Sequence, residues 1–246
     1  MKTHELLPEH FEQFRRLSTC AVASAIETFG VRLRNTGFTN HHIRCIFPEL
    51  PPVVGYAVTA RIRASDPPME GHTYYYRNDW WSAIRNIPAP RIAVVEDLDQ
   101  PAGRGGFVGE VHANVLRALG CTALVTNGAV RDITAVRSTG FQMFAGSVSV
   151  SHAYAHVFDF GGAVEVAGLK VRPGNLLHGD IHGVQTVPLE IAEEVPSVAL
   201  QILRDRERLI GICRSPDFSL DKLREAIKGV ESWFETSANK KPNNVR

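Results

Sequence analysis

The stretch Arg91-Ile-Ala-Val-Val-Glu-Asp, followed by Gly103-Arg-Gly-Gly and by Glu110-Val-His-Ala-Asn-Val-Leu-Arg-Ala-Leu, decides the fold. The first segment is a short apolar run, which is typical of a buried strand. The second is a glycine-rich loop. The third predicts a helix with Val111, Val115 and Leu119 on one face and Gly120 past its end. The order is strand, loop, helix.

The same order repeats directly afterwards. Thr122-Ala-Leu-Val-Thr predicts a second strand, and Asn127-Gly128 is expected to turn the chain. Asp132 is expected to start a short helix to Ser138, before a third strand at Phe141-Gln-Met-Phe-Ala. Strands that alternate with helices favour βαβ units and some parallel sheet, so the fold class is α/β.

The flanking regions predict helices at both ends. A helix is expected over Leu17–Phe29, capped by Ser18 or Thr19 and ended by Gly30, and a strand over Val53–Arg63. After Ala163, short β segments are joined by glycine or proline turns. Two helices are expected over Pro188–Ile210 and Ser219–Phe234. We expect one domain over residues 1–236 and a polar tail over 237–246.

Composition limits the classes of function. The 246 residues are 44% hydrophobic and 22% charged, and the net charge is +1, so no general attraction to nucleic acid is expected. We find neither a secretory signal at the N-terminus nor an apolar run long enough to span a membrane. The four cysteines are scattered without a CxxC pair, which favours a cytoplasmic protein with reduced thiols and places Cys121 in the core.

Arg131 and Asp132 follow a strand and begin a helix, where ligands bind in α/β sheets. An arginine there can bind a carboxylate with two hydrogen bonds, and an aspartate can hold a divalent cation, Mg or Mn. The alternative is structural: Asp132 complements the helix dipole and Arg131 lies on the surface.

Glu110 favours the functional interpretation. It opens the helix after the other glycine-rich loop, so we expect it at the same sheet edge. The amides of Val111 and His112 in the first turn of that helix can bind a carboxylate or an enolate oxygen. Two neighbouring loops would then supply amides, an arginine and two carboxylates to one site.

The spacing of Glu110, twenty residues and Arg131-Asp132 resembles the acidic-x20-Arg-Asp signature of class II 4-hydroxy-4-methyl-2-oxoglutarate aldolases. These enzymes belong to the superfamily of the regulator of ribonuclease activity A. The surrounding sequence also resembles that of the superfamily, in Gly109-Glu-Val-His-Ala-Asn, Thr126-Asn-Gly-Ala-Val-Arg-Asp and Pro173-Gly-Asn-Leu-Leu-His-Gly-Asp-Ile-His-Gly-Val. The similarity runs from about Leu17 to the helix after Pro188.

The resemblance implies a compact α/β/β/α domain with mixed sheets that forms homotrimers or homohexamers. It implies that Asp132 holds the metal, partly through water, and that Arg131 binds a small 2-oxo acid and stabilises its enolate. Gly109 and the amides of Val111 and His112 hold the substrate carboxylate, and Glu110 orders a water on the metal. The implied activity is that of a metal-dependent retro-aldol lyase that releases pyruvate, and oxaloacetate decarboxylation through the same enolate is a second implied activity. A non-enzymatic ribonuclease inhibitor and a lyase for another 2-oxo acid are the alternatives.

Several segments depart from the family pattern or carry a second interpretation. Asn127 and Glu110 stand where many relatives have aspartate. In the aldolases a neighbouring chain supplies a further acidic residue, and Glu207 is the candidate for it here. The aromatic segment 74–81 predicts a short helix packed on the sheet, or a lid or subunit contact through Arg77, Trp80 or Trp81.

His152 and His156 have the spacing of helical zinc ligands but lack the zinc-protease motif. Hydrogen bonding near Asp180 is the expected role of His182, with proton donation as the alternative.

Overall fold

The computed structural model describes residues 6–68 and 78–238. Its main sheet has nine strands, and the path of neighbours is β1-β6-β5-β3-β2-β10-β11, with β4 beside β5 and β7 beside β2. Strands β2, β3, β5 and β6 run parallel, whereas the pairs with β1, β7, β10 and β11 are antiparallel. The predicted α/β class with a mixed sheet is confirmed.

The strands are β1 (Arg44–Cys45), β2 (Val53–Arg63), β3 (Arg91–Asp97), β4 (Gly106–Val108), β5 (Cys121–Val130), β6 (Gln142–Val148), β7 (His156–Phe160), β8 (Val164–Val166), β9 (Leu169–Val171), β10 (Leu176–Asp180) and β11 (Gly183–Val187). The helices are α1 (Pro8–Arg15), α2 (Thr19–Phe29), α3 (Asn78–Ile84), α4 (Glu110–Ala118), α5 (Ile133–Ser138), α6 (Val195–Arg214) and α7 (Leu220–Ala238), with a 3₁₀ turn at Leu189–Ile191. None of the helices in the described ranges is long and apolar enough to cross a bilayer.

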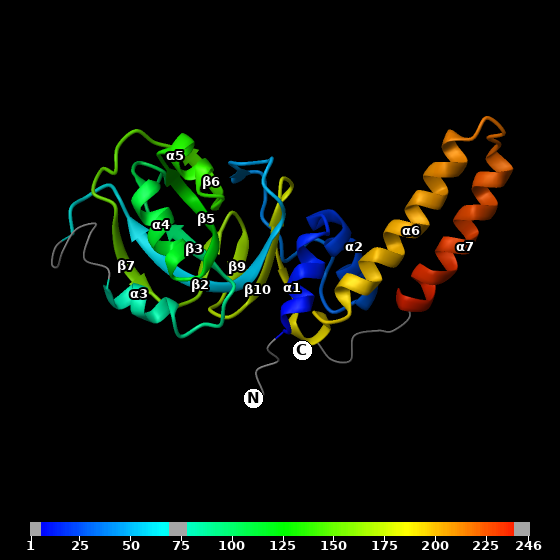
Figure 1. The fold of residues 1–246 in the computed structure, drawn as a ribbon, viewed down its shortest axis with the longest axis horizontal. Coiled ribbons are helices and arrows are strands. Elements are labelled where there is room, and N and C mark those ends of the chain that lie inside the picture. Colours follow the sequence, from blue (N-terminus) through cyan, green and yellow to red (C-terminus); the bar gives the residue numbers. More distant parts are fainter. Residues whose placement is uncertain (1–5, 69–77, 239–246) are drawn as a thin grey trace.

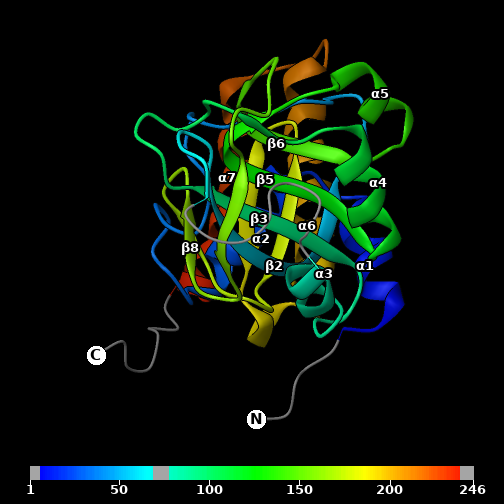
Figure 2. The ribbon, with the colours of Figure 1, turned by 90° about the vertical axis from the view of Figure 1, so that its left-hand side faces the viewer.

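Alternate residues of the central strands face two different cores. In β3, Ala93 and Val95 pack toward α3, α4 and α5, whereas Ile92 and Val94 pack against the β8–β9 hairpin. Both sides of the sheet are therefore buried, as Figure 2 shows with helices on one side and the hairpin on the other. This two-sided burial explains why the sequence of β3 is continuously apolar rather than alternating.

A third core joins the two ends of the chain. Helices α1, α2 and α6 pack together against β2, β10 and β11, around Phe14, Ile26 and Ile202. Figure 1 shows α6 and α7 leaving this core as a helical hairpin that projects from the body of the molecule. The expected helices in the N-terminal and C-terminal parts of the chain, α1 and α2 and then α6 and α7, are confirmed.

Some predicted bounds were wrong. The helix expected from Leu17 begins at Thr19, with Ser18 as its N-cap and Gly30 ending it in the left-handed region, and α1 precedes it. The last helix continues to Ala238, into the stretch expected to be a polar tail. The division into residues 1–236 and 237–246 otherwise stays a prediction.

The aromatic segment contributes to the core. Helix α3 buries Trp80, whose ring lies 5.9 Å from that of Phe107, and the ring of Trp81 meets that of His112 edge-on at 6.3 Å. The expected short helix that packs aromatic rings on the sheet is confirmed for Trp80 and Trp81. Residues 74–77, with Arg77, lie outside the described ranges.

Candidate active site

Arg131 and Asp132 lie where β5 ends, at the carboxyl edge of the parallel strands. Asp132 is the N-cap of α5 and has φ 54° and ψ 39°. The left-handed region costs a residue with a Cβ on the order of 1 kcal/mol, so a native structure keeps it only where the surroundings require it. At Asp132 it turns the carboxylate back toward the glycine-rich loop.

That loop approaches the two residues closely because it lacks side chains. Arg131 donates its amide to the carbonyl of Val108 at 3.0 Å. A Cβ on Gly106 would lie 3.1 Å from Cβ and Cγ of Arg131, and one on Gly109 would lie 2.3 Å from Oδ2 of Asp132. The glycines of the loop therefore make room for both site residues.

The start of α4 completes the cluster. The amide of Glu110 donates to Oδ2 of Asp132 at 3.2 Å, while Nε of Arg131 donates to Oδ1 of the same carboxylate, also at 3.2 Å. Gly109 is the N-cap of α4. Its carbonyl accepts the first hydrogen bond of the helix, from the amide of Ala113. The structure thus brings together Gly109, Glu110, Arg131 and Asp132, as the sequence predicted.

The face of α4 was predicted incorrectly. Its buried residues are His112, Ala113 and Leu116, whereas Val111 is 59% exposed beside Glu110. The His112 ring lies in the core and its Nδ1 is 2.9 Å from the carbonyl of Phe107. The His112 ring therefore packs in the core, and the prediction had assigned substrate binding to its backbone amide rather than to its ring.

Two buried aspartates, which sequence reasoning missed, hold the segment that leads from β3 to the glycine-rich loop. Asp97 accepts from the amides of Gly103, at 2.7 Å, and of Asp99, at 3.0 Å. Asp99 accepts from the amides of Ala64 and Ser65, both at 2.7 Å. Burial raises the pKa of Asp97, although the amides of Gly103 and Asp99 oppose this. An Asp-x-Asp at the end of an apolar strand was the available signal.

The turn that was expected at Asn127 and Gly128 is absent, because both residues lie within β5. The register shifts between Thr126 and Ala129, where β5 bulges against β6. The Asn127 side chain donates to the carbonyl of Asp97 at 2.9 Å and accepts from its amide at 2.7 Å. It therefore continues the pairing with β3 past the last backbone partners and holds the ends of both strands in register.

Structural contacts engage the three histidines that carried a second interpretation, His152, His156 and His182. His152 lies in a loop and His156 begins β7, so the pair does not share a helix; each Nδ1 lies within 3.0 Å of a backbone carbonyl, of Gly106 and Tyr154 respectively. His182 contacts Oδ1 of Asp180 through its amide at 2.8 Å and its Nδ1 at 3.0 Å. The hydrogen bonding expected between His182 and Asp180 is confirmed, and proton donation by His182 stays a prediction.

The residues around Asp132 suit a hard divalent cation. Its side chain is 36% exposed, and within the described ranges each carboxylate oxygen accepts one hydrogen bond, so lone pairs remain. Within the described ranges, no group of three His, Cys, Asp or Glu side chains surrounds a common point. Mg²⁺ fits such a place, because it keeps several waters and takes one or two protein carboxylates together with substrate oxygens.

Together the fold and this cluster define an α/β protein in which a helix start, an arginine and an exposed carboxylate meet at the strand-end edge, where ligands bind in α/β sheets. The family model described as RraA-like, aldolase/RraA, matches residues 19–185, and the chain belongs to this family.

Individual relatives agree. A protein of Halalkalibacterium halodurans named "putative 4-hydroxy-4-methyl-2-oxoglutarate aldolase" is 29% identical over 205 residues, which are 81% of this chain and 87% of that protein. Among solved structures, an uncharacterized protein from Pseudomonas syringae pv. tomato superposes with a TM-score of 0.70 at 19% identity, covering 92% of this chain and 97% of that one. A Streptomyces coelicolor protein described as an unusual member of the RNase ES inhibitor RraA protein family has a TM-score of 0.64 at 18% identity, covering 82% and 97%. These two structures show the shared fold.

Proposed function

We propose that the chain is a divalent-metal-dependent carbon–carbon lyase that cleaves a 4-hydroxy-2-oxo acid to pyruvate and also decarboxylates oxaloacetate. The observation that carries this proposal is the joining of Arg131, Asp132 and the first turn of α4 through a single carboxylate. The name of the Halalkalibacterium relative supports the same class of reaction.

Binding would use the positive end of α4 and the guanidinium. The amides of Val111 and His112 would hold the substrate carboxylate, and Arg131 would bind the end of the substrate that carries the 2-oxo group. Asp132, with Glu110 next to it, would hold the Mg or Mn ion. That ion, when bound, supplies Lewis-acid polarisation of the 2-oxo group.

The chain's own residues would then manage charge and protons. Glu110, exposed at the first position of α4, would accept the proton of the 4-hydroxyl through a water. The bond between C3 and C4 breaks, C4 becomes a carbonyl carbon, and its electron pair forms the pyruvate enolate. Arg131 would stabilise that negative charge before C3 takes a proton. Loss of CO₂ from oxaloacetate gives the same enolate, so one site would serve both substrates.

The test is pyruvate release from 4-hydroxy-4-methyl-2-oxoglutarate and from oxaloacetate, with Mg²⁺ and after its removal by EDTA. We expect release that requires the metal and falls by at least about 10²-fold in Asp132→Ala. Asp221→Ala is the matched control, because its side chain is 90% exposed at the start of α7. The ratio of the two rates ranks aldolase against decarboxylase.

The alternative is a binding protein that keeps the family fold without its chemistry. Folded wild-type protein that releases no pyruvate from either substrate, with Mg²⁺ or Mn²⁺, would contradict the proposed reaction. A panel of other 4-hydroxy-2-oxo acids would then separate a lyase with a different distal pocket from a regulator that turns over none of them.

A further inference from the structure

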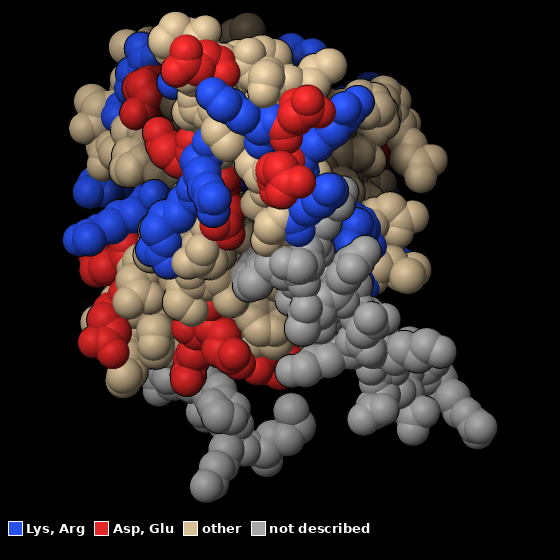
Figure 3. Space-filling view, turned by 90° about the vertical axis from the view of Figure 1, so that its right-hand side faces the viewer, with Lys and Arg blue, Asp and Glu red and all other residues tan. Residues whose placement is uncertain are grey.

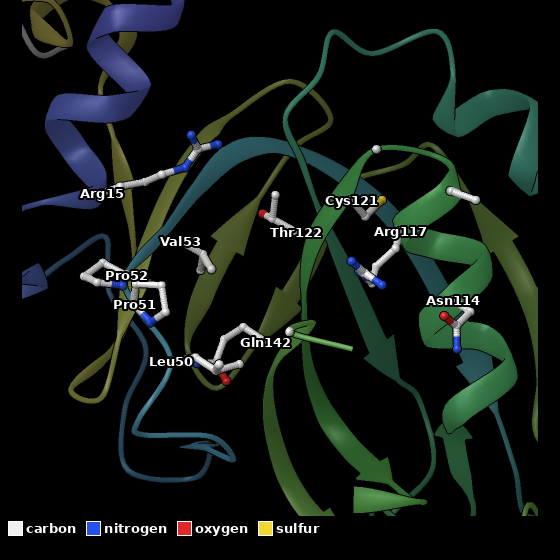
Figure 4. A pocket seen from close by; sticks show the side chains of 13 residues that line it. Arg15, Leu50, Pro51, Pro52, Val53, Asn114, Arg117, Cys121, Thr122 and Gln142 are labelled. Atoms are coloured by element: carbon white, nitrogen blue, oxygen red, sulfur yellow. The ribbon is translucent and has the colours of Figure 1, made fainter. Parts of the chain in front are cut away.

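A groove of about 670 Å³ lies at the opposite edge of the sheet from the candidate active site. It is bounded by the end of α1, the residues that lead into β2, the starts of β5 and β6, and the last turn of α4 (Figure 4). A groove of this size suits a small molecule rather than a single ion. Nothing in the proposed lyase reaction uses it.

The charge of the groove has one sign. Arg15 reaches into it from α1 and Arg117 from α4, on opposite sides of the groove in Figure 4. No carboxylate is among the residues that line it. Low-dielectric walls with a single sign of charge concentrate an oppositely charged ligand, so the groove favours an anion.

The two guanidiniums are available to such an anion. Arg117 makes no ion pair or side-chain hydrogen bond with any residue in the described part of the chain. Arg15 pairs with Glu12 on the same face of α1, and their side chains are 36% and 58% exposed. Exposed pairs of this kind contribute on the order of 0–1 kcal/mol, so a ligand can compete for Arg15.

The other polar lining groups are already engaged. Gln142 is buried, donates to the carbonyl of Phe47 at 2.8 Å and accepts from the amide of Met143 at 2.9 Å. Thr122 donates to the carbonyl of Arg91 at 3.2 Å. One wall is apolar, formed by Leu50, Pro51, Pro52 and Val53. The groove therefore offers two cationic forks beside a hydrophobic surface.

We propose that this groove is a second ligand site, which binds a small organic dianion whose carboxylate or phosphate groups pair with Arg15 and Arg117 while its carbon body lies on the apolar wall. Arginine suits both groups because its planar fork binds either with two parallel hydrogen bonds. Glu110 opens α4 and Arg117 lies in its last turn, so the two sites occupy opposite ends of one helix. Ligands of the two sites would not compete.

The test is calorimetric titration of the metal-free, full-length protein with succinate and with phenyl phosphate. We expect one binding event in the millimolar range or tighter, and the tighter probe identifies the anionic group. Arg117→Gln should weaken it by about tenfold or more, the effect of losing a charge-assisted hydrogen bond. Glu12→Gln should strengthen it a few-fold, because it releases Arg15 and removes a nearby negative charge.

Two controls locate the event. Arg34→Gln makes the same change of charge at an exposed arginine outside the groove, and Arg131→Gln removes the cation of the candidate active site. Both should leave the affinity unchanged. Binding that disappears in Arg131→Gln but survives Arg117→Gln would overturn the proposal, as would the absence of millimolar binding by either probe. Neither result bears on whether the protein releases pyruvate.

Discussion

At the scale of single residues, Asp132 connects the whole candidate site. Its left-handed backbone points one carboxylate at two donors, the Glu110 amide and the Arg131 guanidinium, that come from separate loops. The backbone strain of a non-glycine residue in this region is offset by those two bonds. The position of this carboxylate therefore depends on the room that its neighbours leave.

Gly109→Ala tests that dependence. Gly109 has φ −126° and ψ −160°, an extended conformation that alanine adopts freely, so the backbone itself should tolerate the change. The new Cβ would lie 2.3 Å from Oδ2 of Asp132 and must displace the carboxylate. We expect pyruvate release to fall on the order of 10²-fold, since a shift of about 1 Å in a reacting group costs that much. Steady-state kinetics measures this loss. Urea unfolding should show a change of about 1 kcal/mol or less in the free energy of unfolding.

Gly211→Ala is the matched control for that experiment. Gly211 lies in α6, and a Cβ there meets nothing within 4 Å. We expect full activity and a gain of about 0.5–1 kcal/mol in the free energy of unfolding, because alanine favours the helix and restricts the unfolded chain. Equal loss of activity in both variants would show that the Gly109 effect is not local.

The sequence predicted the members of the site but not their supports. Glu110, Arg131 and Asp132 have a characteristic spacing and stand next to recognisable strand and helix ends, so local signals sufficed. Asp99 and Asn127 act through backbone partners about thirty residues away along the chain, Ala64 for Asp99 and Asp97 for Asn127. Such pairings depend on the tertiary register of β3 and β5, which no local pattern specifies.

At the scale of elements, Asp180 fastens α2 to the β10–β11 hairpin. Its Oδ2 accepts from the amide of Thr19 in the first turn of α2, at 2.9 Å, and its Oδ1 accepts from His182. Gln185 donates to the carbonyl of Thr19 at 2.7 Å, and Nδ1 of the buried His178 lies 3.2 Å from the hydroxyl of Thr19. Burial alone would raise the pKa of Asp180, but the amides of His182 and Thr19 outweigh burial and lower it below the ordinary 3.8.

This lowered pKa predicts how stability changes with pH. A carboxyl group whose folded pKa is depressed stabilises the fold above its unfolded pKa, and that stabilisation is lost as pH falls through the folded value. We expect Asp180→Asn to lower the free energy of unfolding by about 1–3 kcal/mol at neutral pH and by less below pH 3.8. Urea unfolding at a series of pH values and one protein concentration measures the difference.

For Asp221→Asn, the difference in the free energy of unfolding from the wild type should stay close to zero at every pH, because the carboxylate of Asp221 is 90% exposed. A deficit in Asp180→Asn that stays constant from neutral to acid pH would contradict the assignment and indicate a loss of packing instead.

The elements differ in how well local patterns reveal them. The parallel strands and α4 have strong signals in apolar runs and a glycine just past the helix end, and they were predicted. Helix α1 was missed because it is eight residues long and its mean composition is polar, with Phe11 and Phe14 as its only buried residues. Its stability comes from packing on β2 and α6, as most of the stability of short helices does.

At the scale of the whole molecule, the surroundings of the candidate site are unusually apolar. Val111, Val148 and Val150 are 59%, 58% and 94% exposed, and Val148 pairs with Val130 next to Arg131. By contrast, the end of the molecule that carries α6 and α7 shows basic and acidic side chains intermixed (Figure 3). Exposed apolar groups that gather around a site are typical of surfaces that another chain covers.

The trimer or hexamer implied by the family resemblance therefore predicts an interface beside the site. Sedimentation velocity should give a species three or six times the mass of one chain for the wild type. Val148→Lys combined with Val150→Lys should shift it toward the monomer, because burying two ammonium groups without partners costs several kcal/mol. Phe218→Lys, in the exposed turn between α6 and α7, makes a similar change on the projecting hairpin. Dissociation by Phe218→Lys alone would place the interface on the helices, and a monomeric wild type would contradict the assembly.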